Sequence, residues 1–226
     1  MRARRKKHLL ERLDEVNELL LAKEYYGFYD LPEIERYNII DYKKVFDNDN
    51  PVVLEIGAGK GKFANTFATT YKNLNVLAVE KISNVIIDAC ESTKKLGIKN
   101  VKYLNASAEN LKYYVKNNSI ENIYLNFSCP YPKKTYANRR LTYKTYLEIY
   151  KTLLKKGGKI FLKTDNYDFF EFSKESLQNN GFLVFDVCYD LHNTPQFNKE
   201  NILTEYEQKF LEENKKIMRL TASIKD

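Results

Sequence analysis

The sequence predicts an α/β fold, in which a mostly parallel sheet carries helices on both faces and ends in an antiparallel hairpin. From residue 52 to residue 191, short apolar runs alternate with amphipathic segments. Strict alternation of this kind is typical of parallel strands joined by crossover helices. Two strand-like segments then follow each other near the C-terminus, and strands in direct succession usually pair antiparallel. A chain of 226 residues is long enough to bury a sizeable core.

The elements can be assigned in order along the chain. Leucines at helical spacing predict a helix over residues 8–22, and the turn signal DNDNP at 47–51 opens the alternating part. The apolar runs predict strands at 52–57, 75–80, 101–107, 122–127, 159–165 and 182–191. Helices are expected at 60–72, 83–96, 108–116, 142–158 (ended by its glycines) and 167–179, and strand-like pieces at 204–211 and 216–224.

The charge balance suggests a polyanionic partner. Lysine and arginine number 37 against 30 aspartates and glutamates, which leaves a formal charge of +7. One basic cluster spans residues 2–7, and a second consists of Lys133, Lys134, Arg139 and Arg140, interleaved with Tyr131 and Tyr136. The ordinary interpretation of such clusters is a solvated charged face, and the alternative is an RNA-binding surface. The second cluster follows the unusual proline-rich loop LNFSCPYPKK, which favours the alternative there.

Cysteine usage and hydropathy exclude several classes of protein. Cys90, Cys129 and Cys188 are far apart and odd in number, which argues against a disulfide framework or a zinc site. No apolar run approaches the length of a membrane span, and the charged N-terminus lacks the apolar core of a signal peptide. We therefore expect a cytoplasmic protein without a metal or a membrane contact.

The segment VLEIGAGKGKF is a candidate ligand-binding turn. It places Gly57, Gly59 and Gly61 after a predicted strand and at the start of a helix. Glycines allow a ligand to approach the backbone closely, and a helix N-terminus offers unpaired N–H groups. The spacing is G-x-G-x-G, which differs from the G-x-G-x-x-G of pyrophosphate-binding turns. A glycine-rich turn that serves packing alone is the ordinary alternative.

Two glutamates make the identity of the ligand more specific. Glu80 ends the second strand of the alternating part, where an acid can bind both hydroxyls of a ribose and repels a 2′-phosphate. Glu55 lies inside an apolar strand, so it is either an exposed edge residue or a paired or functional carboxylate. A carboxylate at this position could hold the ammonium group of an amino acid. A ribose acceptor and an ammonium acceptor together fit S-adenosylmethionine better than a dinucleotide.

The candidate residues share one position relative to the predicted sheet. Each of the following segments lies at the carboxyl end of a predicted strand: Gly57–Gly61, Glu80, Ser107, Cys129–Pro130 and Thr164–Asp165. In open α/β sheets, ligands bind at that edge. We therefore expect one binding site there.

From the glycine turn to the C-terminus, the sequence resembles the bacterial tRNA (guanine-N7-)-methyltransferases, which are Rossmann-like enzymes that use S-adenosylmethionine. The start MRARRKK fits as well. The matching stretches are LEIGAGKGKF, AVEKISNVI, NVKYLNASAENL, IYLNFSCPYPKKTYANRRLT, FLKTDN, YDLH and NILTEYEQKF. The resemblance implies transfer of a methyl group to N7 of the variable-loop guanine at tRNA position 46. It also implies a methyltransferase domain over residues 51–226, after a basic arm, helix and linker over residues 1–50.

The resemblance assigns roles to individual residues. Glu55, Glu80 and Ser107 correspond to cofactor contacts, beside Gly57 and Gly59 of the glycine turn. Substrate contacts are implied for Lys133, Asp165, Thr204, Glu205, Tyr206 and Glu207. Asp165 and Cys129 are the candidate catalytic residues, and the monomer and the homodimer both remain open.

The chain departs from the family pattern at three positions. Cys129 and Tyr131 stand where the family has aspartate and tryptophan in Asp-Pro-Trp-Pro-Lys, and Ser107 replaces an acid that faces the cofactor. Guanine N7 carries an available lone pair, so methylation requires no general base and rests on positioning and electrostatics. Loss of one acidic contact would cost about 2–4 kcal/mol, which predicts a slow enzyme rather than an inactive one. Tyr131 retains an aromatic face for base stacking.

Three alternatives remain open at this point. Cys129 could act as a nucleophile, as in pyrimidine-C5 methyltransferases, although those enzymes present Pro-Cys and this chain has Ser-Cys-Pro. The S-C-P-Y sequence also resembles the loop of amino-methyltransferases that act on exocyclic base nitrogens. The third alternative is an inactive homologue that binds tRNA, which is suggested by the lost acids at Cys129 and Ser107.

Overall fold

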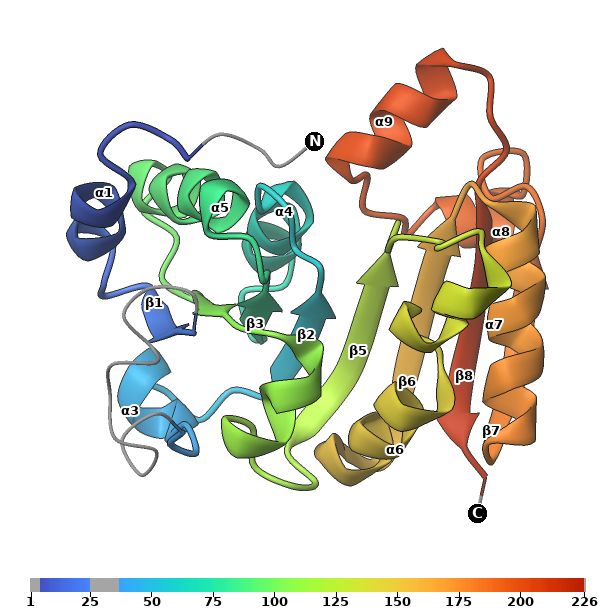
Figure 1. Cartoon of the computed structure of the whole chain (residues 1–226), viewed down its shortest axis with the longest axis horizontal. Coiled ribbons are helices and arrows are strands. Elements are labelled where there is room, and N and C mark those ends of the chain that lie inside the picture. The colour runs from blue at the N-terminus through green and yellow to red at the C-terminus, as the bar shows by residue number, and fades with distance from the viewer. Residues whose placement is uncertain (1–4, 25–36, 226) are drawn as a thin grey trace. The chain divides into compact units, whose positions relative to one another are not determined.

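The computed structural model describes residues 5–24 and 37–225, which belong to two compact units, Met1–Lys116 and Asn117–Asp226 (Figure 1). Each unit contains a sheet with helices packed on it. Arg2 and Arg4 of the N-terminal basic cluster lie outside the described residues. The two units are described separately below.

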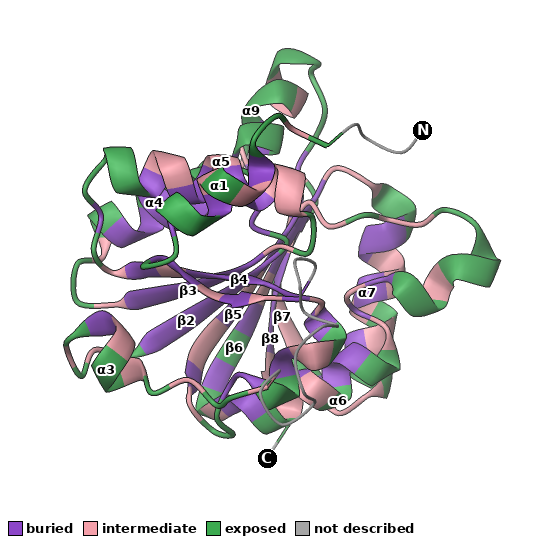
Figure 2. Cartoon of the chain, turned by 60° about the vertical axis from the view of Figure 1, so that its left-hand side comes forward, coloured by how far each residue is buried: buried purple, intermediate pink, exposed green. Residues whose placement is uncertain are grey.

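The first unit holds a parallel sheet with the strand order β1-β4-β3-β2. Its strands are β1 (Leu20–Lys23), β2 (Val52–Ile56), β3 (Asn75–Val79) and β4 (Val101–Asn105). Its helices are α1 (Leu9–Glu15), α3 (Tyr42–Phe46), α4 (Lys62–Thr70), α5 (Ser83–Lys95) and the 3-10 helix η2 (Ala108–Tyr113). Helices α1, α4 and α5 lie on one face of the strands and α3 on the other (Figure 2). Strands β2 and β3 are buried along their whole length, which explains their continuous apolar sequences.

The second unit holds a mixed sheet with the strand order β5-β6-β8-β7. Its strands are β5 (Ile120–Asn126), β6 (Leu154–Thr164), β7 (Phe182–Cys188) and β8 (Met218–Ile224). Its helices are the 3-10 helix η3 (Lys134–Arg139), α6 (Lys144–Leu153), α7 (Tyr167–Asn179), α8 (Pro195–Asn198) and α9 (Glu205–Glu212). Strands β5 and β6 are parallel, and β8 runs antiparallel to both β6 and β7. The predicted α/β class and its antiparallel C-terminal pair are therefore confirmed.

The N-terminal helix is shorter than the sequence predicts. The leucine pattern predicted a helix over 8–22, but α1 ends at Glu15, and the later leucines enter strand β1. Leu20 pairs with Tyr103 of β4, so the backbone of β1 finds its hydrogen bonds in the sheet instead of a helix. The predicted helix at 108–116 is also corrected, because η2 is a short 3-10 helix.

The boundary after α6 was also predicted wrongly. The helix predicted over 142–158 ends at Leu153, and its glycines lie within strand β6. Gly157 has a positive φ of 79°, and the pairing of β5 with β6 shifts in register between Ile120 and Asn122. Glycine inside a strand commonly marks such an irregularity, so these glycines belong to the strand and do not cap the helix.

Residues 204–211 were expected to form a strand and instead form most of helix α9. The N-terminus of α9 carries a capping box, in which the Thr204 hydroxyl accepts from the Glu207 N–H at 3.0 Å. In return the Glu207 carboxylate accepts from the Thr204 N–H at 3.4 Å. The T-x-x-E pattern in the sequence is a helix-start signal that the strand prediction overlooked.

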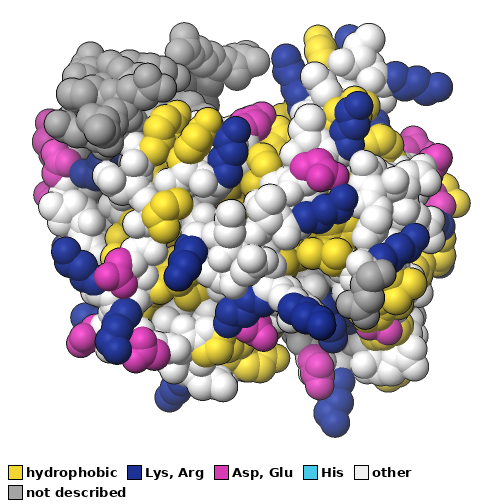
Figure 3. Space-filling model, turned by 90° about the horizontal axis from the view of Figure 1, so that it is seen from below, with side chains coloured by type: hydrophobic (Ala, Val, Ile, Leu, Met, Phe, Trp, Pro, Cys, Tyr) yellow, Lys and Arg dark blue, Asp and Glu magenta, His cyan; other side chains and the backbone are white. Residues whose placement is uncertain are grey.

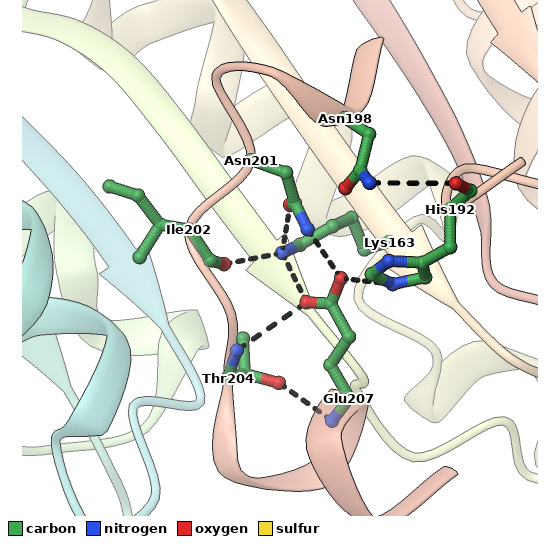
Figure 4. Close-up of polar contacts among 7 residues, drawn as sticks. All are labelled: Lys163, His192, Asn198, Asn201, Ile202, Thr204 and Glu207. Atoms are coloured by element: carbon green, nitrogen blue, oxygen red, sulfur yellow. Dashed lines mark hydrogen bonds and ion pairs between the residues drawn. The ribbon is translucent and has the colours of Figure 1, made fainter. Parts of the chain in front are cut away.

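A buried ion-pair network attaches α9 to the end of strand β6 (Figure 4). The Lys163 ammonium donates to Glu207 Oε2 at 2.6 Å, to Asn201 Oδ1 at 2.9 Å and to the Ile202 carbonyl at 2.8 Å. The other carboxylate oxygen of Glu207 lies 2.9 Å from His192 Nε2 and accepts from Asn201 Nδ2 at 2.7 Å. Glu207 is fully buried, so its charge depends on these partners.

We expect Lys163→Met to lower the free energy of unfolding by about 3–5 kcal/mol, because it leaves the buried Glu207 charge without its cation. The double variant Lys163→Met/Glu207→Met removes both charges and should recover most of that loss. Urea denaturation of the full chain measures both variants.

Lys43→Met is the matched control, because Lys43 pairs with Asp49 at 2.9 Å while both side chains are largely exposed. Its unfolding midpoint should stay close to that of the wild type, since exposed pairs contribute little. A double variant as unstable as Lys163→Met would contradict the interpretation of the network as a charge pair.

Candidate functional site

The glycine turn of the first unit has the backbone geometry of a ligand-binding loop. Gly57, Gly59 and Gly61 all have positive φ values, of 85°, 57° and 79°. The Gly57 N–H donates to the Val79 carbonyl at 2.8 Å, which joins the turn to β3. A Cβ atom at Gly61 would lie 2.7 Å from the Tyr103 hydroxyl, so this glycine is required for packing. At Gly57 and Gly59 a Cβ would meet nothing within 4 Å, so the turn has open space beside it.

Glu80 follows β3 directly, and the backbone of two neighbouring segments holds its carboxylate. Its Oε2 atom accepts from the Gly59 N–H at 3.2 Å, and its Oε1 atom accepts from the Ile82 N–H at 2.9 Å. Burial raises the pKa of Glu80, while these backbone hydrogen bonds act in the opposite direction. Asn105 donates to the Glu80 carbonyl at 2.9 Å and fixes the chain there. The carboxylate is thus held in place but remains half-buried rather than enclosed.

Glu55 lies within the core. Its residue exposure is 2%, which excludes the interpretation as an exposed edge residue. A charged side chain in such a position must be paired or functional. Because Glu55 is two residues before Gly57 on β2, it lies at the same edge of the first sheet as the glycine turn.

Ser107 lies beside the carboxyl groups of Glu24 and Glu109. The Ser107 N–H donates to Glu24 Oε2 at 2.8 Å, and its hydroxyl donates to Glu109. Glu24 follows the outer strand β1, is 3% exposed, and has its pKa raised by burial. Sequence reasoning missed Glu24, because nothing in its local pattern shows that β1 pairs with β4.

The proline-rich loop of the second unit follows strand β5. Phe127 and Tyr131 have positive φ values of 51° and 42°, which side-chain-bearing residues adopt at a cost in free energy. Cys129 is exposed. Arg140 donates to the carbonyls of Pro130 at 2.9 Å and Tyr131 at 3.0 Å. The sequence grouped Arg140 with the outward basic cluster, and this is corrected, because Arg140 is only 8% exposed.

Three cations of that cluster do face solvent. Lys133, Lys134 and Arg139 are exposed, and the Arg139 guanidinium stacks over the Tyr136 ring at 4.7 Å. They lie directly beside the loop, within and around η3. An exposed set of cations with an aromatic ring matches the features expected of a nucleic-acid contact surface.

Asp165 follows strand β6, next to the strand that carries the proline-rich loop. Asn126 of β5 pairs with Lys163 of β6, so the segments that follow the two strands leave the sheet at the same level. The Lys215 ammonium lies 3.6 Å from the Asp165 carboxylate and 2.9 Å from that of Glu213. The negative charge of Asp165 is therefore partly compensated.

The four predicted substrate residues of α9 divide into two pairs. Thr204 and Glu207 are buried in the capping box and in the Lys163 network, so their observed contacts are internal. Glu205 and Tyr206 face solvent. The Tyr206 ring lies 6.2 Å from that of Phe210.

Phe210 extends this aromatic surface toward the proline-rich loop. Its ring lies 5.7 Å from that of Phe127, so three rings form a row from the loop to α9. Sequence reasoning missed Phe210 and Lys163. Lys163 had a signal, because a lysine inside an apolar strand covered by helices requires a partner.

Part of the N-terminal basic cluster is engaged within the first unit. The Lys6 ammonium forms an ion pair with Asp88 of α5, and its backbone N–H donates to Asn84 at 3.0 Å. Arg12 binds both carboxylate oxygens of Glu91 at 2.7 Å. These contacts attach α1 and the preceding residues to α5.

Within the described part of the chain, the face seen in Figure 3 carries no single basic patch, because its lysines and arginines are scattered among acidic and apolar side chains.

Among residues 5–24 and 37–225, no helix is long and apolar enough to cross a membrane. The same residues contain no group of three or more His, Cys, Asp or Glu side chains that could hold a metal ion.

Comparison with known proteins relates this geometry to a family. Residues 49–220 match the family model described as "Putative methyltransferase". A tRNA (guanine-N(7)-)-methyltransferase from Bacillus cytotoxicus is 37% identical over 222 residues, which is 98% of this chain and 96% of that protein.

Solved structures establish the fold. The 16S rRNA methyltransferase KamB aligns with a TM-score of 0.63 at 14% identity, over 84% of this chain and 95% of its own. The phosphoethanolamine N-methyltransferase 2 of Haemonchus contortus, solved in complex with S-adenosyl-L-methionine, aligns with a TM-score of 0.53 at 14% identity. That alignment covers 96% of this chain and 57% of the other. The fold is therefore the Rossmann-like fold of methyltransferases, and the chain belongs to the tRNA (guanine-N7-)-methyltransferase family.

Proposed function

We propose that this protein transfers a methyl group from S-adenosylmethionine to N7 of the variable-loop guanine of tRNA. The observation that carries the proposal is the 37% identity to a tRNA (guanine-N(7)-)-methyltransferase over nearly the full length of both chains. We also propose that residues 51–226 form the methyltransferase domain, in agreement with the family match over 49–220. Residues 1–50 would then be an accessory segment, and a cytoplasmic location follows from the same proposal.

The residues of the first unit fit the proposed cofactor. S-adenosylmethionine, when bound, supplies an activated methyl group together with a ribose and an amino-acid moiety. Glu80 would accept hydrogen bonds from the ribose hydroxyls, because its carboxylate is held in place by the N–H groups of Gly59 and Ile82. The open space at Gly57 and Gly59 suits close approach of a ligand to the backbone. Glu55 would hold the ammonium group.

The residues of the second unit would supply what methylation of guanine N7 requires. The N7 lone pair is already available, so the protein needs to position the base and to stabilise the positive charge that develops. Asp165 would supply part of that negative charge, even with Lys215 nearby. Tyr131 and Tyr206 offer aromatic faces for stacking, and Lys133, with its exposed neighbours, would bind phosphates. Cys129 needs no covalent role in this scheme.

The proposal is tested by incubating unmodified tRNA with labelled S-adenosylmethionine and the full chain, and by mapping the modified nucleoside. We expect N7-methylguanosine in the variable loop. Methylation of an exocyclic nitrogen would support the amino-methyltransferase alternative instead. Binding of both ligands without methyl transfer would identify a tRNA-binding protein without turnover.

We expect Cys129→Asp to raise the single-turnover rate by tens- to several-hundred-fold, because an aspartate offsets the charge on the methylated base. That factor corresponds to about 2–4 kcal/mol of transition-state stabilisation. Cys129→Ser, which adds no charge, is the control and should leave the rate within a few-fold of the wild type. Loss of all activity in Cys129→Ser would instead favour the covalent role of the cysteine.

We expect Glu80→Gln to weaken S-adenosylmethionine binding by about 10- to 100-fold, since a charged acceptor of hydrogen bonds is lost. Burial raises the pKa of Glu80 above its ordinary value of 4.5, and ribose hydroxyls would favour the ionised form. The affinity of the wild type should therefore fall as the pH is lowered through that raised pKa. The affinity of Glu80→Gln should not show this fall, because the variant has no carboxylate at position 80 to be protonated. Calorimetric titration across the acidic range measures both effects, and an identical pH profile for the two proteins would argue against a ribose contact.

A further inference from the structure

Two prolines limit the backbone hydrogen bonds that the proline-rich loop can form. Pro130 and Pro132 lack N–H donors, and Tyr131 between them has a left-handed φ of 42°. Phe127, at the start of the loop, is also left-handed with a φ of 51°. Such conformations persist where the surrounding structure enforces them, and they cluster at functional sites. A group outside the loop that donates hydrogen bonds to its carbonyls can hold this conformation.

Arg140 supplies that group. Its Nε atom donates to the Pro130 carbonyl at 2.9 Å, and one terminal nitrogen donates to the Tyr131 carbonyl at 3.0 Å. The planar guanidinium presents its donors in a fixed fork, so it can bind two successive carbonyls at once. A lysine offers a single nitrogen and cannot reproduce this geometry.

The side chain and backbone of Arg140 are themselves held in place. The guanidinium carbon lies 4.3 Å from the centroid of the Phe172 ring on helix α7, and the residue is only 8% exposed. The Arg140 N–H donates to the Ala137 carbonyl at 3.1 Å, and the Arg140 carbonyl accepts from the Tyr143 N–H at 2.9 Å. The loop is thus tied through Arg140 to a helix of the second unit.

The neighbouring arginine has the opposite orientation. Arg139 is exposed and stacks over Tyr136, whereas Arg140 points back to the start of the loop. The hydrogen bonds of Arg140 therefore close a segment that begins at Pro130, directly after Cys129, and that contains the exposed Lys133 and Lys134. Arg139 is therefore free to contact a ligand from solvent, whereas Arg140 binds the carbonyls of its own chain.

We propose that Arg140 is a positioning residue that holds the proline-rich loop in the shape required for the target base, while Arg139 binds RNA phosphate. The expected effect of Arg140 on methyl transfer rests on the proposed function. The structural part of the inference, that the hydrogen bonds of Arg140 hold the loop like a latch, can be measured without any substrate.

The first experiment uses the thiol of Cys129 as a reporter of the loop. Cys129 is exposed, whereas Cys90 and Cys188 are buried, and burial raises the pKa of the Cys90 thiol to about 12. Labelling of the full chain with a chromogenic disulfide reagent at pH 8 should therefore show one fast thiol. In Arg140→Gln the loop loses its latch, so we expect the fast labelling rate to rise several-fold. Arg139→Gln should label at the wild-type rate.

The second experiment compares the same variants with tRNA. Arg140→Gln should lower kcat by about a hundredfold, since a small misplacement of a reacting group has an effect of that order. The salt dependence of its tRNA affinity should match the wild type. Arg139→Gln should weaken tRNA binding and reduce the slope of log affinity against log salt by about one. Arg140→Lys keeps the charge but not the fork, so its kcat should fall between those of the wild type and Arg140→Gln.

Three results for Arg140→Gln would contradict the proposed role of Arg140. The first is a wild-type labelling rate together with a wild-type kcat, and the second is a low kcat with a wild-type labelling rate. The third is a reduced salt slope of tRNA binding like that of Arg139→Gln. If Arg140→Gln does not fold, Arg140→Lys carries the same three comparisons. An inactive wild type would refute the proposed function alone, because the labelling comparison would still decide whether Arg140 holds the loop.

Discussion

Parallel pairing of neighbouring strands is the constraint on which the candidate residues of each unit depend. In the first unit β4, β3 and β2 run in the same direction, so Ser107, Glu80 and the glycine turn leave the sheet at one edge. In the second unit β5 and β6 pair in the same way and bring the proline-rich loop beside Asp165. Segments that are far apart in the sequence thus become neighbours within each unit through backbone hydrogen bonds.

The side chains that shape the site are buried charges with specific partners. Lys163 and Glu207 neutralise each other beneath the N-terminus of α9, and Arg140 satisfies two carbonyls beneath the proline-rich loop. Burial of a charge is unfavourable unless it is paired and hydrogen-bonded, so such residues strongly restrict the local structure. These contacts attach α9 to strand β6, and they attach the proline-rich loop through Arg140 to α7.

The replacement of acids at Cys129 and Ser107 is compatible with this architecture. The hydrogen bonds of Arg140 to the loop, the row of aromatic rings and the glycine turn all form without an acid at either position. Ser107 lies against Glu24 and Glu109, so negative charge remains near it even though the local sequence lacks the acid. Asp165, which follows the adjacent strand β6, is itself paired with Lys215. Ser107 therefore has carboxyl groups as direct hydrogen-bond partners, whereas the acid predicted to act with Cys129 is partly compensated by a lysine.

The sequence alone determined the features that depend on local patterns. Continuous apolar runs identified β2 and β3, the glycine turn and Glu80 were placed correctly at strand ends, and helix α7 matches its predicted range of 167–179. These assignments succeeded because strand burial and crossover topology leave direct marks on composition and spacing.

Only the tertiary structure decided which polar groups face inward. The basic pair Arg139–Arg140 and the acids of TEYE look uniform in sequence, yet in each set some members are buried and others exposed. The tertiary structure also decided the boundaries of β1 and β6. Their sequences look partly helical, but β1 pairs with β4 and β6 pairs with β5. The physical reason is that hydrogen bonds and ion pairs between segments distant in the chain outweigh local preference, and no local pattern encodes their partners.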